Sequence, residues 1–180
     1  MKRSDIQIDL GYYKTYVELV DDLSLTDAFE KYLAEIQSLN KEILNQLEGK
    51  IYAPDKWTVK EILQHLIDWE RIFSYRALVY ARNDGGITAG HDQDLMATNS
   101  NANSKPLEKI LNDFIAVRKS TISLFRSFDE VDLLRLGENF NMKISPLAMG
   151  FVILGHQIHH FNVIKERYLP LLEKDFSLFN

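Results

Sequence analysis

Three of the chain's five histidines lie in one short segment, GHQIHHFNVIKERY, which spans residues 155–168. His156 and His160 are four residues apart, so in a helix their side chains lie about one turn apart on nearly the same face. Two imidazoles in this relation can bind one metal ion when at least one further ligand comes from elsewhere in the chain. Histidines at this spacing also occur as ordinary core or surface residues, so the pair alone is a weak signal.

A further histidine, His65, lies in a second segment with a strong helical pattern. In a helix its neighbours include Glu61, four residues before it, and Asp68, three residues after it. Three histidines on two helices can form a facial metal site with positions open for water or substrate. Asp68 or Glu61 would then orient the His65 ring through its other nitrogen. Packed histidines hydrogen-bonded to their neighbours are the structural alternative.

The zinc-protease motif is a third interpretation of the same histidines, and the sequence argues against it. That motif requires a glutamate general base directly after the first histidine, and here Gln157 occupies the position.

The composition is that of one folded domain over residues 1–180. The chain is 46% hydrophobic and 26% charged, which is ordinary for a globular protein. A net charge of −5 without a dense Lys/Arg tract argues against a nucleic-acid partner. The absence of cysteine leaves histidine and carboxylate side chains as the metal ligands to expect. We see no signal peptide and no apolar run of membrane-spanning length, so we expect a cytoplasmic protein that does not bind a membrane.

Four amphipathic segments predict an all-α, four-helix bundle. The helices are expected over residues 24–49, 58–82, 104–128 and 145–172, after an irregular N-terminal arm over residues 1–23. Their start signals are a capping box formed by Thr58 and Glu61, Pro106 close behind Ser104, and the pair Ser145-Pro146. Asp129 is expected to cap a short helical turn. The connection over residues 83–104 is rich in Gly, Asn, Ser and Asp, contains His91, and is expected to be irregular.

A helical wheel of the last segment separates its three histidines. One continuous apolar stripe, the expected core face, consists of Leu147, Phe151, Leu154, Ile158, Phe161 and Leu172. His159 lies on a polar strip and is expected to face solvent. His156 and His160 lie on a third, partly apolar strip with Met149, Val152, Ile153 and Val163. We therefore expect this helix to be covered on two sides, by a second helix layer or by a partner subunit in a homodimer.

Three stretches together resemble the DinB/YfiT-like family: WTVKEILQHLIDWERIFSYRALVYAR, the GHDQD that follows it, and the terminal GHQIHHFNVIKERYL. The resemblance extends from about Ser24 to Leu169. It implies a bundle of four helices that binds a divalent metal such as nickel or zinc through three histidines. The family's first ligand corresponds to His65 and its H-x-x-x-H pair to His156 and His160. His91 departs from a position that is often aromatic, and it is either a fourth ligand or, as we favour, an incidental loop residue.

The resemblance also implies a range of activities. Some relatives are transferases that use a low-molecular-weight thiol, and others are described as hydrolases. Our first hypothesis is therefore a metal-dependent transferase or hydrolase, in which the ion activates a water or thiol for attack on a small-molecule substrate. Trp69, Tyr75 or Arg76 would line the substrate site, with Arg76 available to pair with a substrate carboxylate. The alternative is a metal-binding or structural bundle without turnover.

Overall fold

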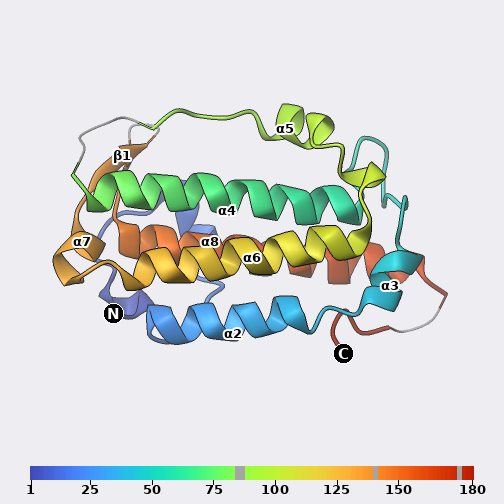
Figure 1. Ribbon diagram of the computed structural model, residues 1–180, viewed down its shortest axis with the longest axis horizontal. Coiled ribbons are helices and arrows are strands. Elements are labelled where there is room, and N and C mark those ends of the chain that lie inside the picture. The colour runs from blue at the N-terminus through green and yellow to red at the C-terminus, as the bar shows by residue number, and fades with distance from the viewer. Residues whose placement is uncertain (84–87, 140–141, 174–175) are drawn as a thin grey trace.

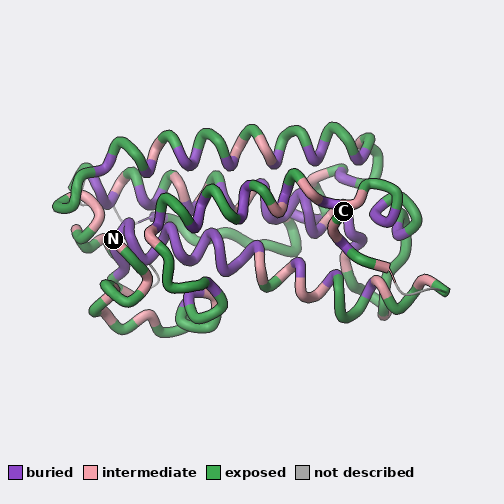
Figure 2. Tube along the Cα trace, turned by 90° about the horizontal axis from the view of Figure 1, so that it is seen from below, coloured by how far each residue is buried: buried purple, intermediate pink, exposed green. Residues whose placement is uncertain are grey.

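Four long helices form the bundle in the computed structural model, which describes residues 1–83, 88–139, 142–173 and 176–180 (Figure 1). They are α2 (Leu25–Gln37), α4 (Val59–Ala81), α6 (Leu107–Arg126) and α8 (Pro146–Val163). Helix α4 packs against α6 and α8, and α2 packs against the same two helices. The predicted all-α, four-helix bundle is confirmed. Figure 2 shows the buried residues on the facing sides of these helices, as expected for amphipathic segments.

The start signals of two helices are confirmed by their hydrogen bonds. The Thr58 hydroxyl accepts from the Glu61 amide at 3.2 Å, and the Glu61 carboxylate accepts from the Thr58 amide at 2.7 Å, which completes the capping box of α4. The Ser145 hydroxyl accepts from the Ala148 amide at 3.2 Å. Ser145 is thus the cap residue of α8, and Pro146 is the first residue of the helix. The start of α6 differs slightly, because Pro106 itself is the cap residue and Ser104 ends a separate 3-10 turn over Ala102–Ser104.

The segment expected as one helix over residues 24–49 is two helices, so this prediction was wrong. Helix α2 ends at Gln37, and α3 (Lys41–Gln46) begins after a break. The chain's last residues pair with the break: the Asn40 amide donates to the Leu178 carbonyl at 2.9 Å, and the Asn180 amide donates to the Ser38 carbonyl at 2.8 Å. The Asn40 side chain then caps α3. The apolar period continues across the break because Ile36, Leu39 and Ile43 are all buried in the same cluster, which concealed the interruption in the sequence.

Two connections contain structure that the sequence analysis missed. Helix α5 (Gln93–Asn99) lies in the connection expected to be irregular, capped by the Asp92 carboxylate and running along the outer side of α4 (Figure 1). Before α8, the short strands β1 (Gly137–Asn139) and β2 (Met142–Ile144) pair as an antiparallel hairpin. The predicted cap by Asp129 is confirmed, since its carboxylate accepts from the Asp132 amide at 2.8 Å at the start of α7 (Glu130–Leu134). Within the predicted connection, residues 84–87 lie outside the described part of the chain.

The N-terminal arm covers the second apolar strip of α8. It contains two 3-10 turns, Arg3–Asp5 and Gly11–Tyr13, and the short helix α1 (Lys14–Val17), which packs on α8. The approach is so close that a Cβ atom at Gly155 would lie 1.9 Å from the Tyr16 carbonyl oxygen. The two-sided burial of α8 is thus explained within the chain, and the homodimer stays a prediction. Helix α8 is also shorter than expected, because a π-helix (Ile164–Tyr168) and a 3-10 turn (Leu169–Leu171) follow it.

The buried apolar residues form two clusters, and a polar layer lies between them. Along α4, Glu70 separates Ile67 of one cluster from Phe73 of the other; along α6, Arg118 separates Phe114 from Ile122. On α8 the layer contains two fully or nearly fully buried polar side chains, those of His156 and Gln157. The candidate site therefore lies near the middle of the bundle rather than in a surface loop.

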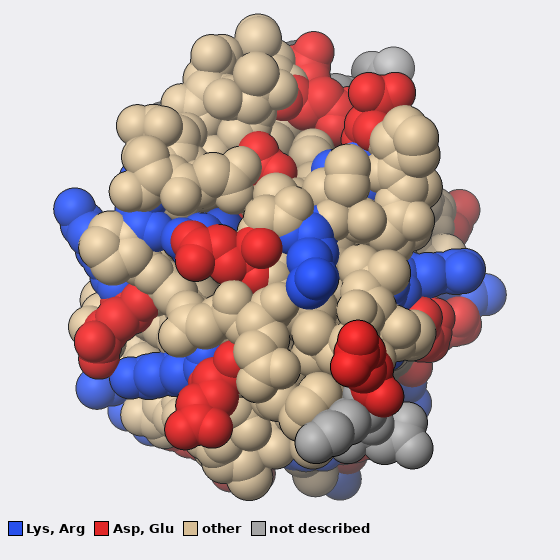
Figure 3. All heavy atoms as spheres, turned by 90° about the vertical axis from the view of Figure 1, so that its right-hand side faces the viewer, with Lys and Arg blue, Asp and Glu red and all other residues tan. Residues whose placement is uncertain are grey.

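In the described ranges no helix is both long and apolar enough to cross a bilayer. On the end of the molecule shown in Figure 3, acidic and basic side chains are interspersed with uncharged surface, without a patch of one sign.

Candidate metal centre

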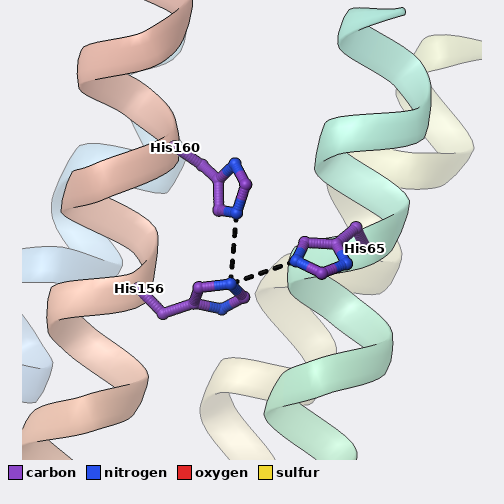
Figure 4. Close-up of side chains that lie close together, drawn as sticks. All are labelled: His65, His156 and His160. Atoms are coloured by element: carbon purple, nitrogen blue, oxygen red, sulfur yellow. Dashed lines mark hydrogen bonds between the residues drawn. The ribbon is translucent and has the colours of Figure 1, made fainter. Parts of the chain in front are cut away.

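Three histidines from two helices converge in the middle of the bundle (Figure 4). The Nε2 atom of His156 lies 3.0 Å from Nε2 of His65 and 3.1 Å from Nε2 of His160. One nitrogen from each ring falls within a set whose members are all within 4.8 Å of one another. The ring centroids are 4.7 to 4.9 Å apart, so the three side chains surround a common point.

These three nitrogens cannot satisfy one another by hydrogen bonds. A ring nitrogen of neutral imidazole carries either one proton or one lone pair, directed in the ring plane. His156 Nε2 therefore serves only one of its two neighbours at a time, which leaves a nitrogen of the group without a partner. Leaving a buried polar group unpaired costs about 1–3 kcal/mol. A cation that accepts all three lone pairs removes this cost, and so the donor set fits a metal ion.

Burial keeps the three rings in the form that binds metals. It lowers the pKa of His65 from 6.5 to about 3. Burial, and then repulsion by the neighbouring imidazoles, lowers the pKa of His156 and of His160 well below 6.5. All three side chains are therefore neutral at pH 7, with a lone pair available on each ring.

An aromatic shell holds the rings in place. The Trp57 ring centroid lies 4.6 Å from that of His65 and 6.4 Å from that of His160. On the opposite side, Tyr16 contacts His156 edge to face, with centroids 5.4 Å apart. The hydroxyl of Tyr168, in the π-helix, donates to the Trp57 carbonyl and so fixes the segment that carries this tryptophan.

The two carboxylates expected beside His65 have other partners. Glu61 accepts from the Thr58 amide in the capping box, at the start of α4. Asp68 accepts from the Gln64 side chain at 2.9 Å and from Arg71 at 3.3 Å. Within the described ranges neither is hydrogen-bonded to His65, so their role in orienting its ring remains a prediction.

The expected substrate residues lie at different depths. Trp69 is half-buried, and its ring lies 5.9 Å from that of His65. Arg76 is fully buried; it donates to the Ala89 carbonyl at 2.9 Å, and its guanidinium lies over the rings of Trp69 and Phe73. Tyr75 is 60% exposed, and its expected place in the substrate site is not supported.

The two remaining histidines lie outside the converging set. His159 is exposed, as the helical wheel predicted, although its ring contacts those of Tyr16 and His160. His91 is exposed in the segment before α5 and does not belong to the converging set. The interpretation of His91 as a loop residue is the one that agrees with this placement.

Two cavities flank the three histidines. The first, of about 290 Å³, reaches His156 and is walled mainly by the aromatic residues Tyr12, Tyr16, Trp69 and Phe73. The second, of about 240 Å³, reaches His160. Gln93, in α5, lines both cavities.

Sequence reasoning missed four residues of this site: Tyr16, Trp57, Phe73 and Gln93. Tyr16 is one of three tyrosines in the N-terminal arm, and Phe73 is one of many apolar residues in the segment over residues 58–82, so neither is distinguished by its position in the sequence. Trp57 and Gln93 lie next to the cap residues Thr58 and Asp92, which was the one local signal that their segments are ordered. Their position at the histidines depends on contacts between distant segments.

Comparisons with known proteins agree with the fold. No curated protein is similar enough to the chain to count as a match. Among solved structures, YfiT from Bacillus subtilis, described as a probable metal-dependent hydrolase with an unusual four-helix bundle topology, has a similar fold. The TM-score is 0.67 at 13% sequence identity, over 92% of this chain and 90% of that one. Residues 13–164 match the DinB superfamily, and the chain therefore belongs to that superfamily.

Proposed function

We propose that His65, His156 and His160 bind one divalent metal ion, and that the chain is a metal-dependent hydrolase or transferase of small molecules. The observation that carries the proposal is the convergence of three Nε2 atoms, from the buried His65 and His156 and the partly buried His160, that cannot satisfy one another. Two ligand nitrogens at about 2.0–2.1 Å from one tetrahedral ion are about 3.3 Å apart. This is close to the 3.0 and 3.1 Å that separate Nε2 of His156 from Nε2 of His65 and of His160. YfiT, which has a similar fold and is described as a probable metal-dependent hydrolase, supports the same class of activity.

The donor set narrows the choice of metal to ions that suit imidazole. Nickel and zinc are the ions we propose, since neutral imidazole favours borderline metals over calcium or magnesium. A site of three protein ligands is typical of catalytic zinc, which keeps a position open, whereas structural sites have four. The two flanking cavities give solutes access to the open position.

The chemistry that such an ion supplies is to lower the pKa of a coordinated water or thiol, and so to provide a nucleophile near neutral pH. The chain's own residues hold the rings neutral and fixed: Trp57 packs on His65 and His160, and Tyr16 packs on His156. The presence of two cavities, one reaching His156 and one reaching His160, favours a transferase that takes a second small molecule, such as a low-molecular-weight thiol, beside its substrate.

Metal titration tests the site directly. Chelator-treated protein titrated with zinc chloride or nickel sulfate in a calorimeter is expected to bind one ion per chain. His65→Gln, His156→Gln and His160→Gln are each expected to weaken binding by more than about 100-fold, since loss of an outer-shell partner alone costs 10- to 100-fold. His159→Gln and His91→Gln are matched controls that keep one ion per chain. A wild-type protein without stoichiometric binding would refute the site.

A second experiment separates the enzyme from a metal-binding or structural bundle without turnover. Ester hydrolysis and addition of a small thiol to an electrophile are measured with the zinc-loaded, nickel-loaded and metal-free protein. Turnover that depends on the ion and is lost in His160→Gln supports the enzyme. One bound ion without turnover in either assay supports the non-catalytic alternative, and light scattering of the same samples tests the proposed homodimer.

A further inference from the structure

The cavity beside His156 is assembled from segments that are distant in the sequence. Tyr12 and Tyr16 come from the N-terminal arm, Trp69 and Phe73 from α4, and Met142 from the β-hairpin. Aromatic rings contact one another along its wall: Trp69 and Phe73 have centroids 5.3 Å apart, and Tyr13 meets Phe73 edge to face. The wall is therefore a set of flat, apolar surfaces with the imidazole of His156 among them.

The two cavities differ in charge. Among the described residues that line the first cavity there is no Asp, Glu, Lys or Arg. The second cavity is lined in part by Asp55, Lys56 and Asp94. In the metal-free chain, a charged ligand buried in the first cavity would lose its hydration without gaining an opposite charge from these walls, which costs far more than burying a neutral one.

We propose that the cavity beside His156 binds an uncharged aromatic group of the substrate. Aromatic rings pack favourably edge to face and offset against other rings, and this wall offers such surfaces on several sides. The inference rests on the proposed function, because it names the substrate class of the same metal site. His156 belongs both to this wall and to the converging set, so the bound group lies directly beside the site.

The wall residues Tyr12 and Tyr16 carry hydroxyl groups, which lie at the solvent-exposed side of the cavity. Their oxygens are 2.7 Å apart, so one hydroxyl donates to the other. Burial and the hydrogen bond to Tyr12 raise the pKa of Tyr16, which keeps it a neutral phenol. Two hydroxyls with one mutual hydrogen bond leave one O–H group free to donate, so the pair can accommodate a neutral polar substituent such as a hydroxyl or carbonyl.

The alternative is a negatively charged substrate paired with Arg76. The Arg76 guanidinium lies over two rings of the wall, 5.8 Å from the Trp69 centroid and 5.7 Å from the Phe73 centroid. It is fully buried and donates to the Ala89 carbonyl, and it is not among the described lining residues. A substrate carboxylate in the cavity would therefore face the rings rather than the guanidinium.

The test uses two probes that share one ring and differ in charge, 4-nitrobenzyl alcohol and 4-nitrobenzoate. Each is titrated calorimetrically into the chelator-treated chain, where binding does not depend on the metal. We expect saturable binding of the alcohol and at least about tenfold weaker binding of the benzoate. Met142→Arg, which places a charge in the wall, is expected to abolish binding of the alcohol; Lys56→Met, in the second cavity, is the matched control and leaves it unchanged. Tyr12→Phe is expected to weaken binding of the alcohol by about two- to tenfold.

A fluorescence measurement locates the probe even if Met142→Arg does not fold. The chain has two tryptophans, and Trp57→Phe leaves Trp69, in the wall of the first cavity, as the only one. Saturable quenching of Trp69 by the alcohol supports the proposal. Benzoate binding as tight as that of the alcohol, or alcohol binding that does not quench Trp69, would overturn it. Metal binding is measured in a separate titration, so the two proposals are tested independently. The cavity can bind the probe in a protein that binds no metal, and the protein can bind metal without binding the probe.

Discussion

Arg118 of α6 and Glu70 of α4 form a two-pronged ion pair in the middle of the bundle. Arg118 Nε donates to Glu70 Oε1 at 2.8 Å, and a second guanidinium nitrogen donates to Oε2 at 3.0 Å. The side chains are 0% and 2% exposed, respectively. The pair lies next to the candidate metal centre, since both residues surround the same small packing gap as His156 and Gln157. It also joins two helices of the bundle at the level where apolar packing is interrupted.

Arg118→Met is expected to destabilise the protein strongly, because it leaves the Glu70 carboxylate buried and unpaired. Loss of one partner of a buried ion pair costs about 3–5 kcal/mol. The double change Glu70→Met with Arg118→Met removes both charges and is expected to cost clearly less. Urea unfolding followed by circular dichroism measures the free energies.

The control for this experiment is the exposed pair of Arg126 and Glu30, which has a hydrogen bond of 2.7 Å. Because these side chains are 57% and 48% exposed, Arg126→Met is expected to cost less than about 1 kcal/mol. Equal losses in the free energy of unfolding for Arg118→Met and Arg126→Met would show that burial of the Arg118–Glu70 pair does not increase the cost of breaking it.

The metal-free protein is expected to lose stability as the pH falls below about 6.5. The folded-state pKa of His65 is about 3, and those of His156 and His160 are also lowered, whereas the same groups in the unfolded chain titrate near 6.5. Between these values the unfolded chain binds protons that the folded chain does not. The free energy of unfolding therefore decreases as the pH is lowered, by up to about 1.4 kcal/mol per pH unit for each group.

Urea midpoints of the chelator-treated protein between pH 7 and pH 5 measure this dependence. His65→Gln is expected to show a shallower dependence, whereas His91→Gln keeps that of the wild type. A slope unchanged by His65→Gln would contradict the assignment of a neutral, buried imidazole at this position.

Gly155→Ala is expected to displace the N-terminal arm from α8. The new Cβ atom would lie 1.9 Å from the carbonyl oxygen and 2.4 Å from the carbonyl carbon of Tyr16, and backbone atoms cannot turn aside as a side chain does. Overpacking typically costs about 1–3 kcal/mol. Faster proteolytic cleavage within residues 10–20, together with a lower urea midpoint, would report the displacement.

Gly150→Ala is the matched control on the same helix. Its new Cβ atom would meet the ends of the Leu25 and Phe125 side chains at 2.9 to 3.0 Å, which can shift. A loss of stability as large as that of Gly155→Ala, with equally fast cleavage of the arm, would argue against a specific contact between Gly155 and Tyr16.

Bound metal is expected to raise the melting temperature, because an ion that binds only the folded state stabilises it by mass action. At a free zinc or nickel concentration 100 times the dissociation constant the gain is about 2.7 kcal/mol. Differential scanning fluorimetry with and without the ion measures the shift, and excess chelator is expected to reverse it. A shift of equal size in His156→Gln would assign the effect to another part of the chain.

The residues that local patterns determine could be predicted from the sequence. The capping box at Thr58, the cap at Ser145 and the i, i+4 spacing of His156 and His160 depend only on neighbours within one helix. The convergence of His65 with that pair needed the further assumption that the two helices face each other, which the family resemblance supplied and the structure agrees with.

Features that depend on distant contacts could not be predicted. The break between α2 and α3 exists because residues 38–40 bond to the chain's last residues. The burial of Glu70 and Arg118 requires each to find the other across two helices, and a charged residue in an amphipathic pattern is otherwise expected on the surface. The placement of Tyr16 and Gln93 at the histidines has the same origin, since neither segment carries a strong period of its own.

The contact of the N-terminal arm with α8 also has a consequence for the order of folding. Tyr12 and Tyr16 belong to the first turns of the chain, and His156 belongs to the last long helix. Closing a loop of this length carries an entropic cost that is recovered only when the whole bundle is in place. During synthesis the arm is made before α8 and cannot pack until α8 has folded. The aromatic wall beside His156 is therefore among the last parts of the bundle to form.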